Sequence, residues 1–163
     1  MSPTVRKAPE WNDVTKELTP AQTVALTILG EAMPGSLDAM RDVGAVIRNR
    51  LALGRWGDSY KDVCLAPWQF STWREAGGRK NYERIMRHAR ILLDPTQARA
   101  EDVIEAIWVA EGIMTGMLRD SVSGATHYYA PLAMVPKGKV PSWAKHQTPV
   151  KAAHGHVFFT GIS

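Results

Sequence analysis

A helix that is apolar on nearly every side is predicted for residues 19–33. It begins with Thr19 as the N-cap, Pro20 in the first turn and Gln22 three residues after the cap. Pro34-Gly35 ends it. At 100° per residue, its apolar side chains cover most of the circumference. Such a helix lies at the centre of its domain, so we expect the rest of the chain to fold around it.

A narrow polar stripe runs along this helix and ends in a carboxylate. The stripe consists of Thr23, Thr27, Gly30 and Glu31. Gly30 leaves space that would let a ligand come close to Glu31. Two interpretations of Glu31 stay open at this point, a solvated charge at a helix end and an acid that faces a polar cleft. The second is the arrangement that general acid catalysis requires.

Further helices and then strands are predicted after this helix. The helices are expected at 36–53, 81–93 and 98–117. The strands are expected within 124–131 and 154–161, where β-branched and aromatic residues are bounded by glycine or proline. We therefore expect an α+β fold with a helical core and a small antiparallel β-sheet in the C-terminal part.

Composition indicates one folded domain. The chain has 163 residues, of which 45% are hydrophobic. Residues 1–18 are polar and lack periodicity, so we interpret them as an N-terminal extension and 19–163 as a single catalytic domain. Cys64 lies among apolar residues and is interpreted as a buried hydrophobe. The net charge of +4 favours polyanionic partners, which include nucleic acid, anionic membranes and acidic wall polymers.

The segment Trp68–Trp73, WQFSTW, combines aromatic rings with polar side chains, as sugar-binding sites do. In an extended conformation, alternation would place Gln69, Ser71 and Trp73 on one side. Trp68, Phe70 and Thr72 would then face the other side, with at least one of the two aromatic rings in the core.

The histidines and basic residues carry weaker signals. His154 and His156 would share one face of a strand, and His127 and His146 could approach them. Two histidines at this spacing are a weak metal signal, so we favour polar packing or substrate hydrogen bonding and expect no metal and no cofactor. The arginines, Arg50 among them, are expected on solvated helix faces.

Five motifs and an isolated tryptophan occur in order from Leu18 to the C-terminus: ILGEAMPGS, VGAVIRNR, WQFSTW, DSVSGATHYY, Trp143 and HGHVFF. Together they resemble the SleB-type cell-wall hydrolases, which include spore-cortex-lytic enzymes and phage endolysins. The resemblance implies a lysozyme-like fold, activity on peptidoglycan glycan strands, and Glu31 as the catalytic acid. The chain departs from the family where Asp120 is followed by Ser-Val instead of Pro-Thr.

The expected substrate-binding residues follow from these motifs. They are Gln69, Ser71, Trp73, Asp120, Tyr128, Trp143 and His156. Because no second carboxylate lies in an apolar motif, and as the resemblance implies, we favour lytic transglycosylation at the MurNAc–GlcNAc bond over a two-carboxylate muramidase. A zinc N-acetylmuramoyl-L-alanine amidase and a nonenzymatic module that binds wall polymer or nucleic acid are the remaining alternatives.

The expected partners are peptidoglycan glycan strands, without nucleic acid and without stable membrane association, and the protein is expected to be a monomer. The first residues lack the apolar core of a signal peptide, and no run is long enough to span a bilayer. We therefore expect a cytoplasmic protein that is released to the cell wall, as a phage endolysin is.

Overall fold

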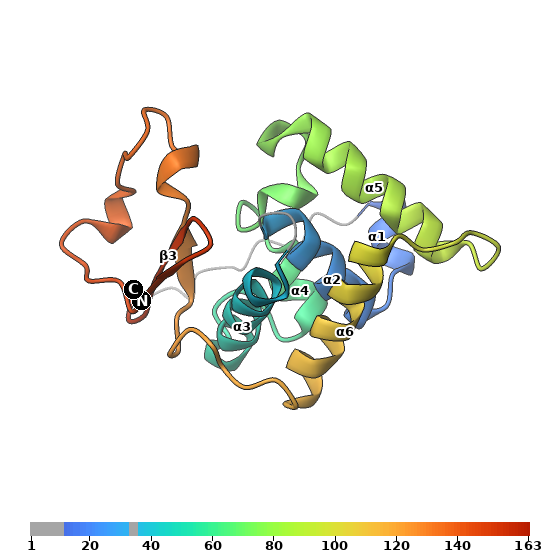
Figure 1. The fold of residues 1–163 in the computed structure, drawn as a ribbon, viewed down its shortest axis with the longest axis horizontal. Helices are drawn as coiled ribbons and strands as arrows, with labels where there is room; N and C mark the ends of the chain where they lie inside the picture. Colours follow the sequence, from blue (N-terminus) through green and yellow to red (C-terminus); the bar gives the residue numbers. More distant parts are fainter. Residues whose placement is uncertain (1–11, 33–35) are drawn as a thin grey trace, which may run out of the picture.

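The computed structural model describes residues 12–32 and 36–163 (Figure 1). The α-helices of this part are α1 (Asp13–Glu17), α2 (Pro20–Glu31), α3 (Leu37–Leu53), α4 (Tyr60–Leu65), α5 (Arg79–Leu93) and α6 (Glu101–Thr115). The β-strands are β1 (His127–Tyr129), β2 (Lys151–Ala153) and β3 (His156–Phe159). Helices thus precede a small antiparallel sheet, and the predicted α+β class is confirmed.

Helix α2 lies among the other helices (Figure 1), as its apolar pattern predicts. Every residue from Thr23 to Leu29 is buried. The predicted capping box is present, since Thr19 Oγ1 accepts a hydrogen bond from Gln22 N and Gln22 Oε1 accepts one from Thr19 N. The helix ends at Glu31, and the predicted end near Met33 and Pro34-Gly35 falls outside the described residues.

Two short helices were not predicted. Helix α1 forms inside the segment interpreted as an extension, and Lys61 Nζ attaches its end to the domain by hydrogen bonds of 2.8 Å to Thr15 O and 2.7 Å to Leu18 O. Helix α4 lies in the aromatic-rich connection after α3. It contains Cys64, which is buried as predicted, and burial raises the pKa of its thiol to about 12.

The three-stranded sheet has the order β1-β3-β2 and is antiparallel throughout. Paired residues share a face, so Tyr128 and Phe158 lie on one side, together with His156. This side packs against the main helical core. Tyr129 and Phe159 lie on the other side, which packs in a second small cluster with Trp143, Ala144 and Ile162. The sheet therefore separates two cores.

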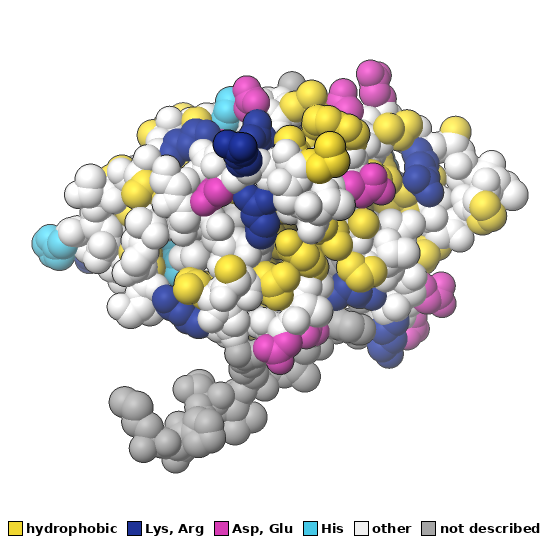
Figure 2. Space-filling view, turned by 90° about the horizontal axis from the view of Figure 1, so that it is seen from below, with side chains coloured by type: hydrophobic (Ala, Val, Ile, Leu, Met, Phe, Trp, Pro, Cys, Tyr) yellow, Lys and Arg dark blue, Asp and Glu magenta, His cyan; other side chains and the backbone are white. Residues whose placement is uncertain are grey.

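The molecular surface mixes side chains of several kinds. On the face in Figure 2, basic and acidic side chains lie among hydrophobic ones. Within the described residues, no helix has the length and apolar character needed to cross a bilayer.

Candidate active site

Glu31, the last residue of α2, is partly buried and receives hydrogen bonds on both carboxylate oxygens. Oε1 accepts from Thr72 N at 3.0 Å and Thr72 Oγ1 at 2.8 Å, with Ser71 Oγ at 3.4 Å. Oε2 accepts from the Tyr128 hydroxyl at 3.1 Å. Donors from a loop and from the sheet thus fix the carboxylate, which stays partly exposed at the helix end.

Thr72 is the main partner of Glu31, and its role was not predicted. Residues Ser71–Trp73 form a 3₁₀ helix, η1, instead of an extended segment. The predicted alternation of side chains is therefore wrong, and Thr72 points to the same carboxylate as Ser71. Thr72 also fills the space beside Gly30, where an added Cβ would overlap the Thr72 side chain. That space is thus taken by the protein, and the prediction that it admits a ligand is wrong.

Tyr128 and His156 approach Glu31 from the sheet. Burial, followed by the negative charge of Glu31, raises the pKa of Tyr128 well above its ordinary value, so the phenol stays protonated and donates. The His156 ring is buried and lies 4.8 Å from the Tyr128 ring, centroid to centroid. Burial lowers the pKa of His156 despite the nearby carboxylates, so a neutral imidazole supports the phenol.

Arg50 is buried, and its expected position on a solvated face is wrong. Its exposed fraction is 5%. Nε donates to Thr126 O at 2.7 Å, and Nη1 donates to Gln69 Oε1 at 3.1 Å. The guanidinium lies 4.8 Å from the Trp56 ring centroid and 5.0 Å from that of Phe70. Burial lowers its pKa to about 10, which leaves it charged at neutral pH.

The remaining predicted residues of the WQFSTW motif have different environments. Gln69 is exposed, but its Oε1 is held by Arg50 and by Trp56 Nε1 at 3.1 Å. Trp73 is partly buried, and its Nε1 donates to Thr27 Oγ1 at 2.9 Å. Phe70 belongs to the core, as expected for one of the two aromatic rings, whereas Trp68 is 67% exposed.

Within the described residues, neither Asp120 nor Trp143 forms a hydrogen bond with Glu31 or with the residues that donate to Glu31. Asp120 Oδ1 accepts from Val122 N at 2.9 Å, and Oδ2 accepts from Gly124 N at 2.6 Å and from Asn49 Nδ2 at 3.3 Å. It thus shapes the loop before β1. Trp143 packs on the far side of the sheet, with its ring 5.3 Å from Phe159. Their roles in substrate binding stay predictions.

The histidines do not form the arrangement considered for a metal. His154 is exposed in the turn between β2 and β3, with a φ of 52°, whereas His156 is buried. The prediction that they share a strand face is therefore wrong. Among residues 12–32 and 36–163, no three His, Cys, Asp or Glu side chains are grouped closely enough to hold a metal ion.

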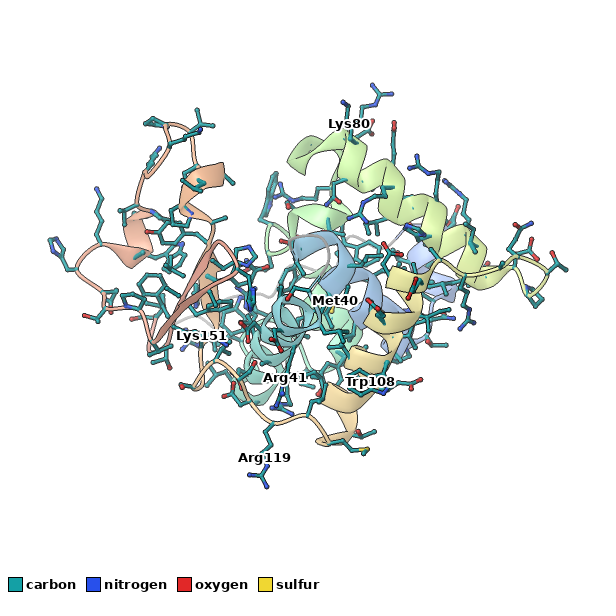
Figure 3. The ribbon with its side chains drawn as sticks, viewed as in Figure 1. Met40, Arg41, Lys80, Trp108, Arg119 and Lys151 are labelled. Carbon is teal, nitrogen blue, oxygen red and sulfur yellow. The ribbon has the colours of Figure 1, made fainter. Side chains whose placement is uncertain are left out.

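A fully buried carboxylate, Asp42, lies on α3. Its Oδ1 accepts from Lys151 Nζ at 2.9 Å and from Ser121 Oγ at 2.6 Å. Figure 3 shows Lys151 between the sheet and the part of α3 that carries Met40 and Arg41. This ion pair joins β2 to α3, so Asp42 serves to attach the sheet.

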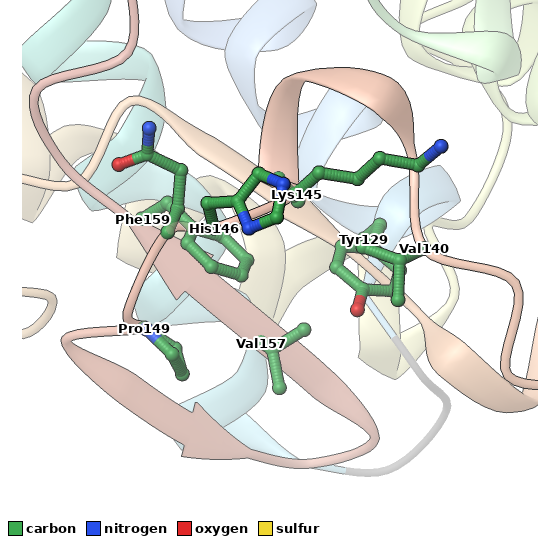
Figure 4. A pocket seen from close by; sticks show the side chains of 9 residues that line it. Tyr129, Val140, Lys145, His146, Pro149, Val157 and Phe159 are labelled. Carbon is green, nitrogen blue, oxygen red and sulfur yellow. The ribbon is translucent and has the colours of Figure 1, made fainter.

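A hollow of about 490 Å³ lies at the second cluster and not at Glu31 (Figure 4). Tyr129, Val157 and Phe159 line it from the sheet, with Lys145 and His146 from the preceding loop. These strand residues face away from Tyr128. The hollow is thus separated from Glu31 by the sheet.

Comparisons with known proteins place the chain in a family. The sequence matches the family model described as Cell Wall Hydrolase over residues 35–159. The match covers more than half of the chain, so the protein belongs to the cell-wall hydrolase family, and the resemblance to SleB-type enzymes is confirmed. Because the match begins after Glu31, the catalytic role of Glu31 stays a prediction. A comparison with curated protein sequences gives no match.

Two solved structures share the fold. One is the catalytic domain of the germination-specific lytic transglycosylase SleB from Bacillus anthracis, with 16% identity and a TM-score of 0.60 over 93% of this chain and 98% of that one. The other is the catalytic domain of the Bacillus cereus SleB protein, with 16% identity and a TM-score of 0.61 over 94% and 95%. The predicted helical core with a small C-terminal sheet is thus found in both.

Thr72→Val keeps the side-chain shape but removes a hydroxyl donor to Glu31. Loss of such a bond costs about 1–3 kcal/mol, so the initial rate of wall-suspension clearing should fall roughly 5- to 150-fold. Ser71→Ala removes only the 3.4 Å contact and should lose less. Equal clearing rates for Thr72→Val and the wild-type protein, at equal melting temperature, would contradict this role.

Gly30→Ala should destabilise the domain by about 1–3 kcal/mol, because its Cβ overlaps Thr72. Adding Thr72→Gly removes all three overlapping atoms, Oγ1, Cγ2 and Cβ, so the double variant should regain part of the lost stability in urea unfolding while clearing stays low. If Gly30→Ala alone unfolds like the wild-type protein, the close contact does not constrain this helix end.

His127 should make stability depend on pH. Burial, then the charges of Arg50 and Arg55, lower its pKa from 6.5 to about 4. As pH drops, His127 therefore binds a proton in the unfolded chain before it does so in the folded protein. The free energy of unfolding then falls between about pH 6.5 and about pH 4. His127→Phe keeps a ring beside Trp56 and Trp143 but cannot titrate, so its urea stability should fall less over this range. Identical pH slopes for both proteins would refute this.

Proposed function

We propose that this cell-wall hydrolase cleaves the MurNAc–GlcNAc bond of peptidoglycan as a lytic transglycosylase, with Glu31 as acid and then base. The observation that carries the proposal is the carboxylate of Glu31, held by Thr72 on one oxygen and Tyr128 on the other. The similar fold of a protein described as a lytic transglycosylase also supports it.

The reaction needs one acid. Protonated Glu31 gives its proton to the glycosidic oxygen as the bond from that oxygen to muramyl C1 breaks. The resulting carboxylate is stabilised by the donors from Thr72 and Ser71. It then takes the proton of the muramyl 6-hydroxyl while that oxygen bonds to C1. The products are a free GlcNAc end and a 1,6-anhydromuramyl end, and Glu31 is protonated again.

The environments of the other carboxylates favour this route over a two-carboxylate muramidase. A retaining hydrolase needs a second carboxylate ~5–5.5 Å from the first. Both oxygens of Asp120 accept hydrogen bonds within its own loop, and Asp42 is paired with Lys151. Within the described residues, neither the Asp120 nor the Asp42 side chain forms a hydrogen bond with Ser71, Thr72 or Tyr128, the residues that donate to Glu31.

Glu31→Gln should retain the fold and lose clearing of wall suspensions by ~10²–10⁴-fold, because an amide cannot exchange the proton. Mass spectrometry of wild-type digests should find muramyl ends lighter than hydrolytic ends by one water, with or without EDTA. Glu75→Gln is the matched control, because Glu75 lies in an exposed 3₁₀ turn, where its carboxylate forms a 3.6 Å ion pair with exposed Arg79.

Full activity in folded Glu31→Gln would overturn the assignment of the acid. Reducing muramic ends throughout, together with an inactive Asp120→Asn variant, would identify a muramidase instead. Free peptides and inhibition by EDTA would identify an amidase. The endolysin role, release from the cytoplasm and the monomeric state stay predictions, and the last can be measured by light scattering.

A further inference from the structure

Trp68 presents an exposed aromatic ring close in sequence to the donors of Glu31. Trp68 is 67% exposed and lies three residues before Ser71, which donates to Glu31. Its φ of 66° lies in the left-handed region, which a bulky residue rarely adopts and which costs about 1–3 kcal/mol. An exposed indole contributes little burial free energy and the backbone strain opposes folding, so the folded domain gains little from a tryptophan at this position.

The neighbouring side chains of the motif contact other residues of the protein. Gln69 binds Arg50, Phe70 is buried in the core, and Thr72 binds Glu31. Trp73 binds Thr27. Trp68 is therefore the member of this motif whose ring is available to a ligand, on the segment that also positions the carboxylate.

Arg74 holds the Trp68 ring in place from one side. Its guanidinium carbon lies 4.7 Å from the Trp68 ring centroid, within the range of a cation–π contact. Arg74 itself follows η1, where its N–H donates to Ser71 O at 3.0 Å. A ring that is already oriented loses less conformational freedom when it binds a ligand on its other face.

We propose that Trp68, oriented by Arg74, is a glycan subsite on which a pyranose ring of the substrate strand stacks beside the bond that Glu31 cleaves. The proposal rests on the proposed function, since it names how that substrate is held. The apolar C–H face of a sugar packs well on an indole ring. Phe70, two residues after Trp68, is buried in the core and attaches this segment to the rigid part of the domain.

The test compares Trp68→Ala and Trp68→Gly with the wild-type protein on purified peptidoglycan. Both variants should raise the KM for clearing about tenfold, which equals about 1.4 kcal/mol of binding free energy, with little change in kcat. Glycine adopts the left-handed region freely, so Trp68→Gly should melt no lower than the wild-type protein. Arg74→Met should raise the KM by a smaller factor, because the ring remains but is less well oriented.

Trp108→Ala is the matched control. Trp108 is 59% exposed on α6, which lies on the other side of α3 from the sheet (Figure 3), and its removal should leave the KM unchanged. Sedimentation of the Glu31→Gln protein with peptidoglycan, with and without Trp68→Ala, gives binding independently of turnover.

The outcomes separate the two proposals. An active wild-type enzyme whose Trp68→Ala variant keeps the wild-type KM and sedimentation would overturn the subsite alone. A Trp68→Gly variant that melts well below the wild-type protein would reassign Trp68 to structure. Absence of any glycan products from the wild-type protein would overturn the proposed function, and the subsite with it.

Discussion

The guanidinium of Arg50 is the interaction on which the active-site region depends. It extends from α3 and bonds Thr126 O, which leads into β1, and Gln69, which leads into η1. Those two segments supply the donors to Glu31. A buried cation is costly unless its hydrogen bonds are made. Here the cost is offset by two acceptors and two aromatic faces, and the same contacts set the distance between sheet and helices.

The helices could be predicted where local signals were strong. The capping residues Thr19 and Ser36 and the regular apolar spacing located α2 and α3 to within a few residues. Helix α4 is too short for its periodicity to stand out among the surrounding turn residues. Strand β2, Lys-Ala-Ala, has no strand pattern of its own and forms because its backbone pairs with β3, a tertiary effect that propensity does not record.

The site was only partly predictable. Glu31, Ser71 and Tyr128 were identified because each is a polar member of an apolar motif, and the structure brings them together. Thr72 was assigned to the wrong side because a 3₁₀ turn replaces the extended alternation on which that assignment depended. Arg50 follows the apolar Val43 and Ile47 at helical spacing, so its burial had a signal in the sequence, although the usual exposure of arginine outweighed it.

The position of the sheet between two cores has a consequence for how the molecule loses activity. Among the described residues, the far cluster has three buried members, Ala144, Phe159 and Ile162, so opening it exposes far less apolar surface than opening the main core. Its strand β1 also carries Tyr128. Partial unfolding that frays the sheet would thus detach the phenol from Glu31 while α2 remains helical. Heat inactivation is then expected to precede the loss of helical circular dichroism, and strand amides to exchange hydrogen before those of α2.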